Sequence, residues 1–187
     1  MAANLNVKEN QTMMIQSLIR TIPDYPKPGI QFRDVTTLFK DPKGLQTTIE
    51  RLRERYADQG IDKVVGVESR GFIVGAPLAY MLGAGFVPAR KPGKLPAETI
   101  GQDYALEYGH DRLEIHTDAI APGERVLLVD DLLATGGTAE AAAQLIQRLG
   151  GTLVECAFIV DLPDLGGHAR LEKSGLAVFV LCEFAGE

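Results

Sequence analysis

The chain has 187 residues, 45% hydrophobic and 24% charged, which suits one globular domain with a substantial core and leaves little room for two. Its formal net charge is −6, so a broad cationic surface for nucleic acid or for an anionic membrane is not indicated. The N-terminus lacks the basic start and apolar core of an export signal, and no apolar run reaches the roughly 20 residues that span a bilayer. The two cysteines, Cys156 and Cys182, have no zinc-type spacing. We therefore expect a cytoplasmic protein that holds any anionic ligand in a local site.

Two helices are predicted in the N-terminal third of the chain. Apolar residues recur at helical spacing in "MMIQSLIRTI" from Met14 onward, and Pro23 should end that helix. In "DPKGLQTTIERLRERYADQG", Asp41 suits an N-cap, Pro42 suits the first helical position and Gly60 is the expected stop.

Short, continuous apolar runs rich in valine predict the strands of the core. Such runs suit strands that are buried on both faces of a parallel sheet. Helical patterns lie between most of them, which predicts an α/β single domain with a mainly parallel twisted sheet flanked by helices. The runs are "KVVGV", "GFVPA", "RVLLVD", "TLVECAFIV" and "AVFVL".

One long segment, residues 90–123, contains no core helix. Within it, apolar and polar residues alternate from Tyr104 to Tyr108 before Gly109, which predicts a partly exposed two-stranded hairpin. A long excursion from a compact domain is more often a lid than a packing element, although an ornamental surface hairpin is the alternative.

The stretch "VLLVDDLLATGGTAEAAAQLI" carries the clearest chemical signal. A buried strand delivers Asp130 and Asp131 to its carboxyl end, where open α/β sheets bind ligands. A turn then leads into a helix, whose N-terminus presents unpaired N–H groups and the positive end of the helix dipole. Glycines in the turn let the backbone approach a ligand and threonines offer hydroxyls, so the turn predicts a phosphate site. The turn residues are Ala134, Thr135, Gly136, Gly137 and Thr138.

The two acids beside this turn indicate the rest of the ligand. Carboxylates repel phosphate, so Asp130 and Asp131 should face hydroxyl donors, and a ribose 5-phosphate supplies both groups. The turn is not a Walker A loop, because no lysine precedes Thr138. A flavodoxin-like turn gives the paired acids no role, and "GAGFVP" has Pro88 where a dinucleotide fingerprint needs glycine. An ordinary acidic strand end with a glycine turn is the plainest alternative.

"VLLVDDLLATGGT" resembles the phosphoribosyl pyrophosphate (PRPP) motif of type I phosphoribosyltransferases. The segments "DYPKPGIQFRDVT", "VVGVESRGF", "GFVPARKPGKLP" and "YALEYG" are similar to blocks of the adenine phosphoribosyltransferase family, in the same order. The resemblance implies that residues 1–187 form a single domain, with an N-terminal helix and base-binding hood over 1–40, a flexible catalytic loop over 90–123 and the PRPP-binding motif over 126–138.

The same resemblance implies the reaction and its partners. Adenine and PRPP would give AMP and pyrophosphate in purine salvage, in a homodimer, with Mg²⁺ entering on PRPP and no protein residue assigned as a metal ligand. The leaving pyrophosphate would be held by Ser69, Arg70, Arg90, Lys91 and Lys94, although Lys91 and Lys94 could instead be solvated surface charges. A strained turn peptide is implied beside Gly71.

Family likeness also implies the base-handling residues. Glu107 would act as the acid or base near the purine, with Tyr108 beside it and Arg70 completing the catalytic set, although the residues alone favour a solvated hairpin carboxylate at Glu107. Adenine would contact Gln31, Phe32, Arg33 and Leu162, although Phe32 could simply belong to the core.

Further alternatives are a transferase for xanthine or guanine and a PRPP-sensing regulator without activity. The histidines, which have no metal-ligand spacing, should be surface residues: His110, His116 and His168.

Overall fold

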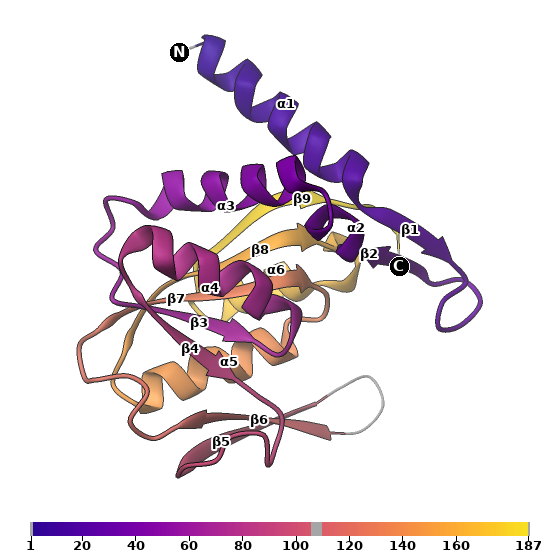
Figure 1. Ribbon diagram of the computed structural model, residues 1–187. Helices are drawn as coiled ribbons and strands as arrows, with labels where there is room; N and C mark the ends of the chain where they lie inside the picture. Colours follow the sequence, from indigo (N-terminus) through magenta and orange to yellow (C-terminus); the bar gives the residue numbers. More distant parts are fainter. Residues whose placement is uncertain (1, 106–109, 187) are drawn as a thin grey trace.

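The computed structural model describes residues 2–105 and 110–186 of the chain. Its centre is a five-stranded parallel sheet with the strand order β4-β3-β7-β8-β9 (Figure 1). All five strands coincide with the valine-rich runs, so the predicted α/β class with a parallel sheet is confirmed. They are β3 (Lys63–Val67), β4 (Gly85–Ala89), β7 (Arg125–Leu133), β8 (Thr152–Asp161) and β9 (Val178–Glu183).

Helices cover both faces of the sheet (Figure 1). Helices α3 and α4 lie on one face with α1 beside α3, whereas α5 lies on the opposite face together with the hairpin of β5 and β6. The main helices are α1 (Ala2–Leu18), α3 (Pro42–Tyr56), α4 (Arg70–Leu82), α5 (Gly137–Arg148) and α6 (Gly167–Lys173), and the short ones are α2 (Thr36–Phe39) and the 3₁₀ turn η1 (Pro163–Leu165). No helix within the described ranges is long and apolar enough to cross a membrane.

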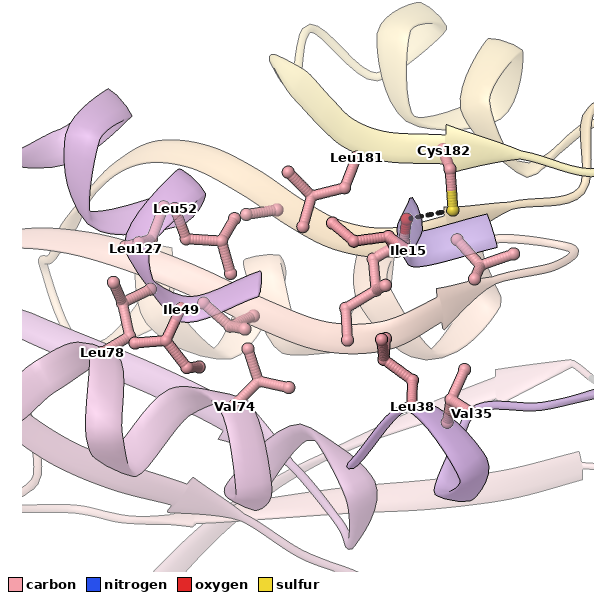
Figure 2. Close-up of a cluster of buried hydrophobic side chains, with 14 of the residues drawn as sticks. Ile15, Val35, Leu38, Ile49, Leu52, Val74, Leu78, Leu127, Leu181 and Cys182 are labelled. Carbon is pink, nitrogen blue, oxygen red and sulfur yellow. Dashed lines mark hydrogen bonds between the residues drawn. The ribbon is translucent and has the colours of Figure 1, made fainter. Parts of the chain in front are cut away.

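Neighbouring residues of the central strands point alternately into two separate apolar clusters. On β7, Leu127 and Val129 join the cluster beneath α3 and α4, whereas Val126 and Leu128 join the cluster beneath α5. Figure 2 shows the first cluster, to which α3 contributes Leu52. The sheet is therefore buried on both faces, which explains why its strands are continuous apolar runs.

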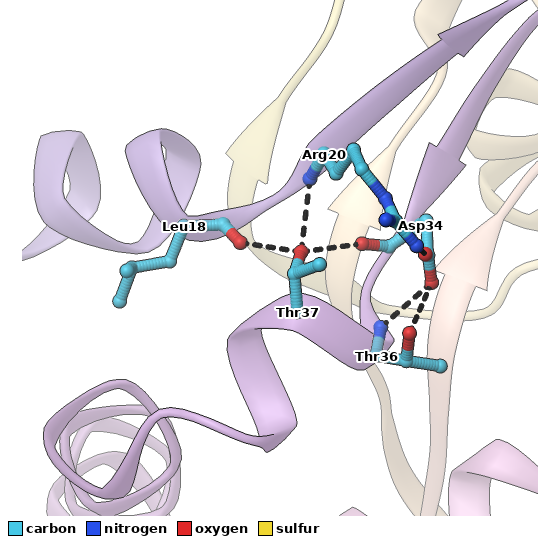
Figure 3. A network of polar contacts seen from close by, with 5 residues as sticks. All are labelled: Leu18, Arg20, Asp34, Thr36 and Thr37. Atoms are coloured by element: carbon cyan, nitrogen blue, oxygen red, sulfur yellow. Dashed lines mark hydrogen bonds and ion pairs between the residues drawn. The ribbon is translucent and has the colours of Figure 1, made fainter.

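The N-terminal helix ends earlier than its apolar spacing predicts. Helix α1 stops at Leu18, and the next residues form β1 (Arg20–Pro23), which pairs antiparallel with β2 (Gln31–Asp34). The cause is a tertiary contact (Figure 3): the Thr37 hydroxyl accepts a hydrogen bond from the Arg20 N–H at 3.0 Å and lies 2.6 Å from the carbonyl oxygen of Leu18. The helical spacing of apolar residues continues past Leu18, but the residues after Leu18 pair with β2 and form a strand.

The start of α3 is as predicted. The Asp41 carboxylate accepts a hydrogen bond from the Gly44 N–H at 2.7 Å, and Pro42 occupies the first helical position. The helix ends at Tyr56, before Gly60.

The predicted hairpin is present as β5 (Thr99–Ala105) and β6 (His110–His116). Its stem is fixed to the body of the protein, because Tyr104, Leu113 and Ile115 are at most 7% exposed and belong to the cluster beneath α5. The stem is therefore packed on the body of the protein, and the lid role of the segment stays a prediction.

Candidate active site

The paired acids lie where β7 passes the carboxyl end of the sheet. Asp131 is 4% exposed, and its carboxylate accepts a hydrogen bond from Nε of Arg70 at 2.5 Å. Its backbone N–H donates to the carboxylate of Asp130 at 2.9 Å. Burial, reinforced by the charge of Asp131, raises the pKa of Asp130 well above its usual value. Among the described residues, the hydrogen bonds to these two carboxylates come from Arg70 and from the Asp131 N–H, so hydroxyl donors of a ligand would suit their remaining oxygen lone pairs.

An open cavity of about 360 Å³ brings together several of the predicted site residues. Asp130 and Asp131 form one part of its wall, Ser69 and Arg70 another, and Lys91 a third. The cavity is thus bounded by cations and carboxylates, as a ligand with both phosphate and hydroxyl groups requires. Its remaining lining residues are Val67, Glu68, Leu132 and Thr138.

A second, smaller cavity of about 90 Å³ is formed by the predicted phosphate turn. The turn leads into α5 at Gly137, and the preceding Gly136 has a φ of +79°, a conformation that favours glycine. Asp130 and Thr138 line both cavities, so the phosphate-sized cavity and the larger one are adjacent. The turn residues that line it are Ala134, Thr135, Gly136, Gly137 and Thr138.

The loop before α4 lies directly against the acids. Ser69 precedes the helix and Arg70 begins it, and the peptide bond between Glu68 and Ser69 is cis. Although its partial burial opposes the charge, the carboxylates of Asp131 and Asp130 raise the pKa of Arg70, which keeps it cationic. A fixed positive charge therefore lies beside the two acids.

Glu68, which the sequence did not suggest as a site residue, organises the basic segment after β4. Its carboxylate accepts hydrogen bonds from Nε of Arg90 at 3.1 Å and from the backbone N–H of Lys91 at 2.9 Å. The available signal was an acid directly after the buried strand β3, at the carboxyl end of the sheet. Lys94 is exposed, and its carbonyl oxygen accepts a hydrogen bond from Arg90 at 3.2 Å.

Lys91 also connects the cavity to the hairpin. Its ammonium group forms an ion pair with Asp111 and donates a hydrogen bond to the Tyr104 hydroxyl at 2.7 Å. Burial opposes the charge of Lys91, but the bonds to Asp111 and Tyr104 outweigh it and raise the pKa. Lys91 is therefore not simply a solvated surface charge.

The predicted base-binding residues Gln31, Phe32 and Arg33 lie on β2, in the β1–β2 ribbon. Phe32 is half-buried and packs edge-on against Tyr25, with ring centroids 5.2 Å apart, so it does not belong to either apolar cluster. The guanidinium group of Arg33 donates two hydrogen bonds. Nη1 donates to the Thr21 hydroxyl at 2.5 Å, and Nη2 donates to the carbonyl oxygen of Ala185 at 2.9 Å.

The ribbon lies within electrostatic range of Arg70. Asp34, at the end of β2, contributes to the raised pKa of Arg70.

Leu162 follows β8, is 7% exposed and packs into the cluster beneath α3 and α4. Glu107 and Tyr108 lie outside the described residues.

The histidines differ from one another in their surroundings. His110 is exposed and His116 is half-buried. His168 is partly exposed, and its Nδ1 lies 3.0 Å from a carboxylate oxygen of Asp161, which is itself 1% exposed.

Comparison with known proteins identifies relatives of nearly the whole chain. The model of the phosphoribosyl transferase domain matches residues 34–184. An adenine phosphoribosyltransferase of Nitrosospira multiformis is 68% identical over 174 residues, which cover 93% of this chain and 99% of the relative.

Solved structures agree with this result. A crystal structure of adenine phosphoribosyltransferase from Thermoanaerobacter pseudethanolicus has a TM-score of 0.88 at 49% identity, covering 92% of this chain and 99% of that one. The enzyme from Saccharomyces cerevisiae, complexed with an imino-altritol bisphosphate and adenine, has a TM-score of 0.86 at 40% identity, covering 92% and 99%.

Proposed function

Because the chain belongs to the phosphoribosyl transferase domain family, we propose that it transfers the 5-phosphoribosyl group of PRPP to adenine, giving AMP and pyrophosphate in purine salvage. The observation that carries this function is the shared wall of the two cavities. Asp130 lines both the phosphate-sized cavity and the larger one that contains Arg70 and Lys91. A 5-phosphate in the first cavity would place the ribose hydroxyls at the acids and the pyrophosphate beside the cations.

The chemistry requires that the ribose C1–oxygen bond to pyrophosphate breaks while a purine nitrogen attacks C1. The transition state has oxocarbenium character, so charge develops on the departing pyrophosphate. Arg70 and Lys91, both kept cationic by carboxylate partners, would neutralise that charge, with Ser69, Arg90 and Lys94 from the same two loops. Fixed cations of this kind stabilise the transition state without reorganising during the reaction.

Glu107 would exchange the proton of the adenine imidazole ring, with Tyr108 beside it, as the family resemblance implies. Support comes from the hairpin stem, which Lys91 connects to the cavity through Tyr104 and Asp111. We assign the acid or base role to Glu107 because it belongs to the segment between the two hairpin strands.

Adenine would bind at the β1–β2 ribbon. Phe32 offers an aromatic face that is not used by the core, and Gln31 and Arg33 flank it on β2 with backbone groups. Leu162, at the carboxyl end of β8, would close the other face of the base. The exocyclic amine of adenine can donate a hydrogen bond where the carbonyl of hypoxanthine cannot, so a fixed acceptor would select adenine.

Magnesium would enter with PRPP. Asp130 and Asp131 line the cavity that would hold the diphosphate, but we assign them to the ribose hydroxyls and propose no protein side chain as a ligand of the cation. Among the residues that the structure describes, no group of at least three His, Cys, Asp or Glu side chains could hold a metal ion. When bound, the cation would supply charge neutralisation to the diphosphate oxygens.

A homodimer is the assembly that we propose. Helix α4 begins at Arg70 and exposes large apolar side chains along one stripe, with Ile73 43%, Tyr80 87% and Met81 42% exposed. A second copy covering this stripe would lie close to the catalytic cavity. Light scattering after size-exclusion chromatography should give a dimer for the native chain and a monomer for Tyr80→Asp, whereas a native monomer would contradict the proposal.

We also propose that the protein works in the cytoplasm. Both cysteines are free and buried, which suits a reducing compartment.

The deciding experiment measures pyrophosphate release from PRPP and Mg²⁺ with adenine, hypoxanthine, guanine or xanthine supplied separately. Release with adenine alone, matched by AMP formation, is expected. Release with another base would support transfer from PRPP but would show that the purine substrate is that base and not adenine. PRPP binding without release would favour a regulator that senses PRPP.

A further inference from the structure

The phosphate turn rests on the start of α6, a helix to which neither the sequence nor the family resemblance gave a role. A Cβ atom on Gly167 would lie 2.1 Å from the carbonyl oxygen of Ala134 and 2.9 Å from the backbone nitrogen of Gly136. Conversely, a Cβ atom on Gly136 would lie 3.0 Å from the carbonyl oxygen of Gly167. No side chain fits between the two backbones, so the shape of the turn depends on the position of α6.

Arg170, one turn further along α6, connects the same helix to α5. Its Nε and Nη2 donate to one carboxylate oxygen of Glu140, at 2.9 and 2.7 Å, while the Ser174 hydroxyl donates to the other at 2.7 Å. Nη1 of Arg170 also lies 3.5 Å from the carbonyl oxygen of Thr135, within the turn itself. One guanidinium group thus contacts both the turn and the first turn of the helix that follows it.

The charge of Glu140 makes this contact relevant to phosphate binding. Glu140 lies in the first turn of α5, and its N–H bonds to the carbonyl of Gly136 at 2.9 Å. The Ser174 and Arg170 hydrogen bonds outweigh burial and lower the pKa of Glu140, so it is ionised at neutral pH. An unpaired carboxylate here would repel a phosphate dianion at the N-terminus of α5, whereas a carboxylate paired with Arg170 repels it much less.

Helix α6 is itself fixed to the sheet, as a support for the turn must be. Leu171 is fully buried in the cluster beneath α5, and His168 lies 3.0 Å from the buried carboxylate of Asp161 at the end of β8. The helix therefore has anchors on two sides that do not involve the phosphate turn.

We propose that α6 holds the phosphate turn in its anion-binding shape and screens Glu140 from the 5-phosphate, with Gly167 and Arg170 as positioning residues for that group. This role rests on the proposed function, because it assigns the turn to the 5-phosphate of PRPP and AMP. Neither residue is a catalytic residue, since both act through the turn and through Glu140.

Arg170→Met tests the proposal with two ligands that occupy different parts of the site. Titration calorimetry should show ribose 5-phosphate binding about tenfold more weakly, since one charge-assisted contact is worth roughly 1.5 kcal/mol or more. Inorganic pyrophosphate, which the loop of Arg70 would bind, should bind with unchanged affinity. In steady-state kinetics, the KM for PRPP should rise while the KM for adenine and kcat stay close to the native values.

Controls separate positioning from general destabilisation. Arg53→Met removes an exposed arginine from α3 and should leave both affinities unchanged. Arg170→Lys retains a cation and should recover part of the affinity for ribose 5-phosphate. Adding Glu140→Gln to Arg170→Met should also recover part of it, because the repelling carboxylate is removed. Thermal unfolding midpoints confirm that each variant is folded.

The glycine contact is tested by Gly167→Ala against Gly85→Ala. The first methyl group would meet backbone atoms of the turn, whereas the second would meet only the flexible side chain of Lys63. Selective loss of ribose 5-phosphate binding is expected for Gly167→Ala alone.

The proposal is overturned if Arg170→Met binds ribose 5-phosphate like the native protein, or if it loses ribose 5-phosphate and pyrophosphate equally. A native protein that binds ribose 5-phosphate but turns over no base would refute the proposed function. The role of α6 would still be decided by the binding data.

Discussion

The phosphate turn and the β1–β2 ribbon, to which we assign the two halves of the substrate pair, are built in different ways. The turn is continuous with the buried strand β7 and the helix α5, and α6 supports it from behind. The ribbon consists of two strands of four residues each and is joined to the body by polar contacts around Asp34 (Figure 3). In the proposed site, recognition of the phosphoribosyl group would thus be part of the core, whereas recognition of the base would be carried by a thin, separate element.

The largest loss is expected from removing the two acids beside the turn. Asp130→Asn combined with Asp131→Asn should lower kcat/KM for PRPP about a hundredfold or more, since each charge-assisted hydrogen bond is worth roughly 1.5–3 kcal/mol. The pair Asp58→Asn with Asp118→Asn makes the same charge change at exposed positions and should have no effect. Native PRPP affinity in the first double variant would contradict the ribose-binding role.

Glu107→Gln tests whether the chemical step depends on a residue that lies outside both the phosphate turn and the β1–β2 ribbon. We expect kcat to fall by about 10²–10⁴, the usual contribution of a general acid or base, with the affinities for PRPP and adenine retained. Presteady-state and binding measurements separate these effects, and Glu98→Gln is the matched exposed control. An unchanged kcat would remove Glu107 from the mechanism.

Phe32→Ala sharpens the comparison from the ribbon side. Loss of base stacking should raise the KM for adenine about tenfold, because stacking on an aromatic side chain is worth roughly 1–3 kcal/mol. The KM for PRPP should not change, and Phe32→Tyr should retain most of the adenine affinity. Equal increases in both KM values would show that the ribbon and the turn are not independent.

The smallest effect is expected from Asp34, whose polar contacts join the β1–β2 ribbon to the body of the protein. The Asp34 pKa is lowered from 3.8 to about 2 by the hydrogen bonds from Thr36 and Arg20. Because the folded-state pKa is the lower one, this carboxylate stabilises the fold above about pH 4, and the stabilisation is lost as pH falls toward about 2.

Asp34→Asn should therefore lower the free energy of unfolding by about 1 kcal/mol at neutral pH, a modest value because Arg20 is well exposed. Urea unfolding at pH 7, 5, 4 and 3 should show the difference between the native chain and the variant shrinking below pH 4. A difference independent of pH would mean that the charge of Asp34 is not its cause.

The sequence predicted the turn better than the ribbon for a physical reason. The turn's strand, acids, glycines and helix occupy one contiguous stretch, so local rules suffice from Val126 to Thr138. The end of α1 depends instead on Thr37, which lies beyond the ribbon in the sequence, so periodicity alone extended the helix too far. The ion pair of Lys91 with Asp111 and the bonds of Glu68 to the loop after β4 likewise depend on how distant segments meet.

The alternation of side chains along β7 limits where the length of the chain can vary. Inserting or deleting one residue in β7 before Asp130 would move the apolar side chains beyond it to the opposite face and would shift both acids relative to the cavity. Extra residues between β6 and β7, around the exposed Pro122 and Gly123, would change neither face. Length differences among natural relatives should therefore fall in that connection and be absent from the strand.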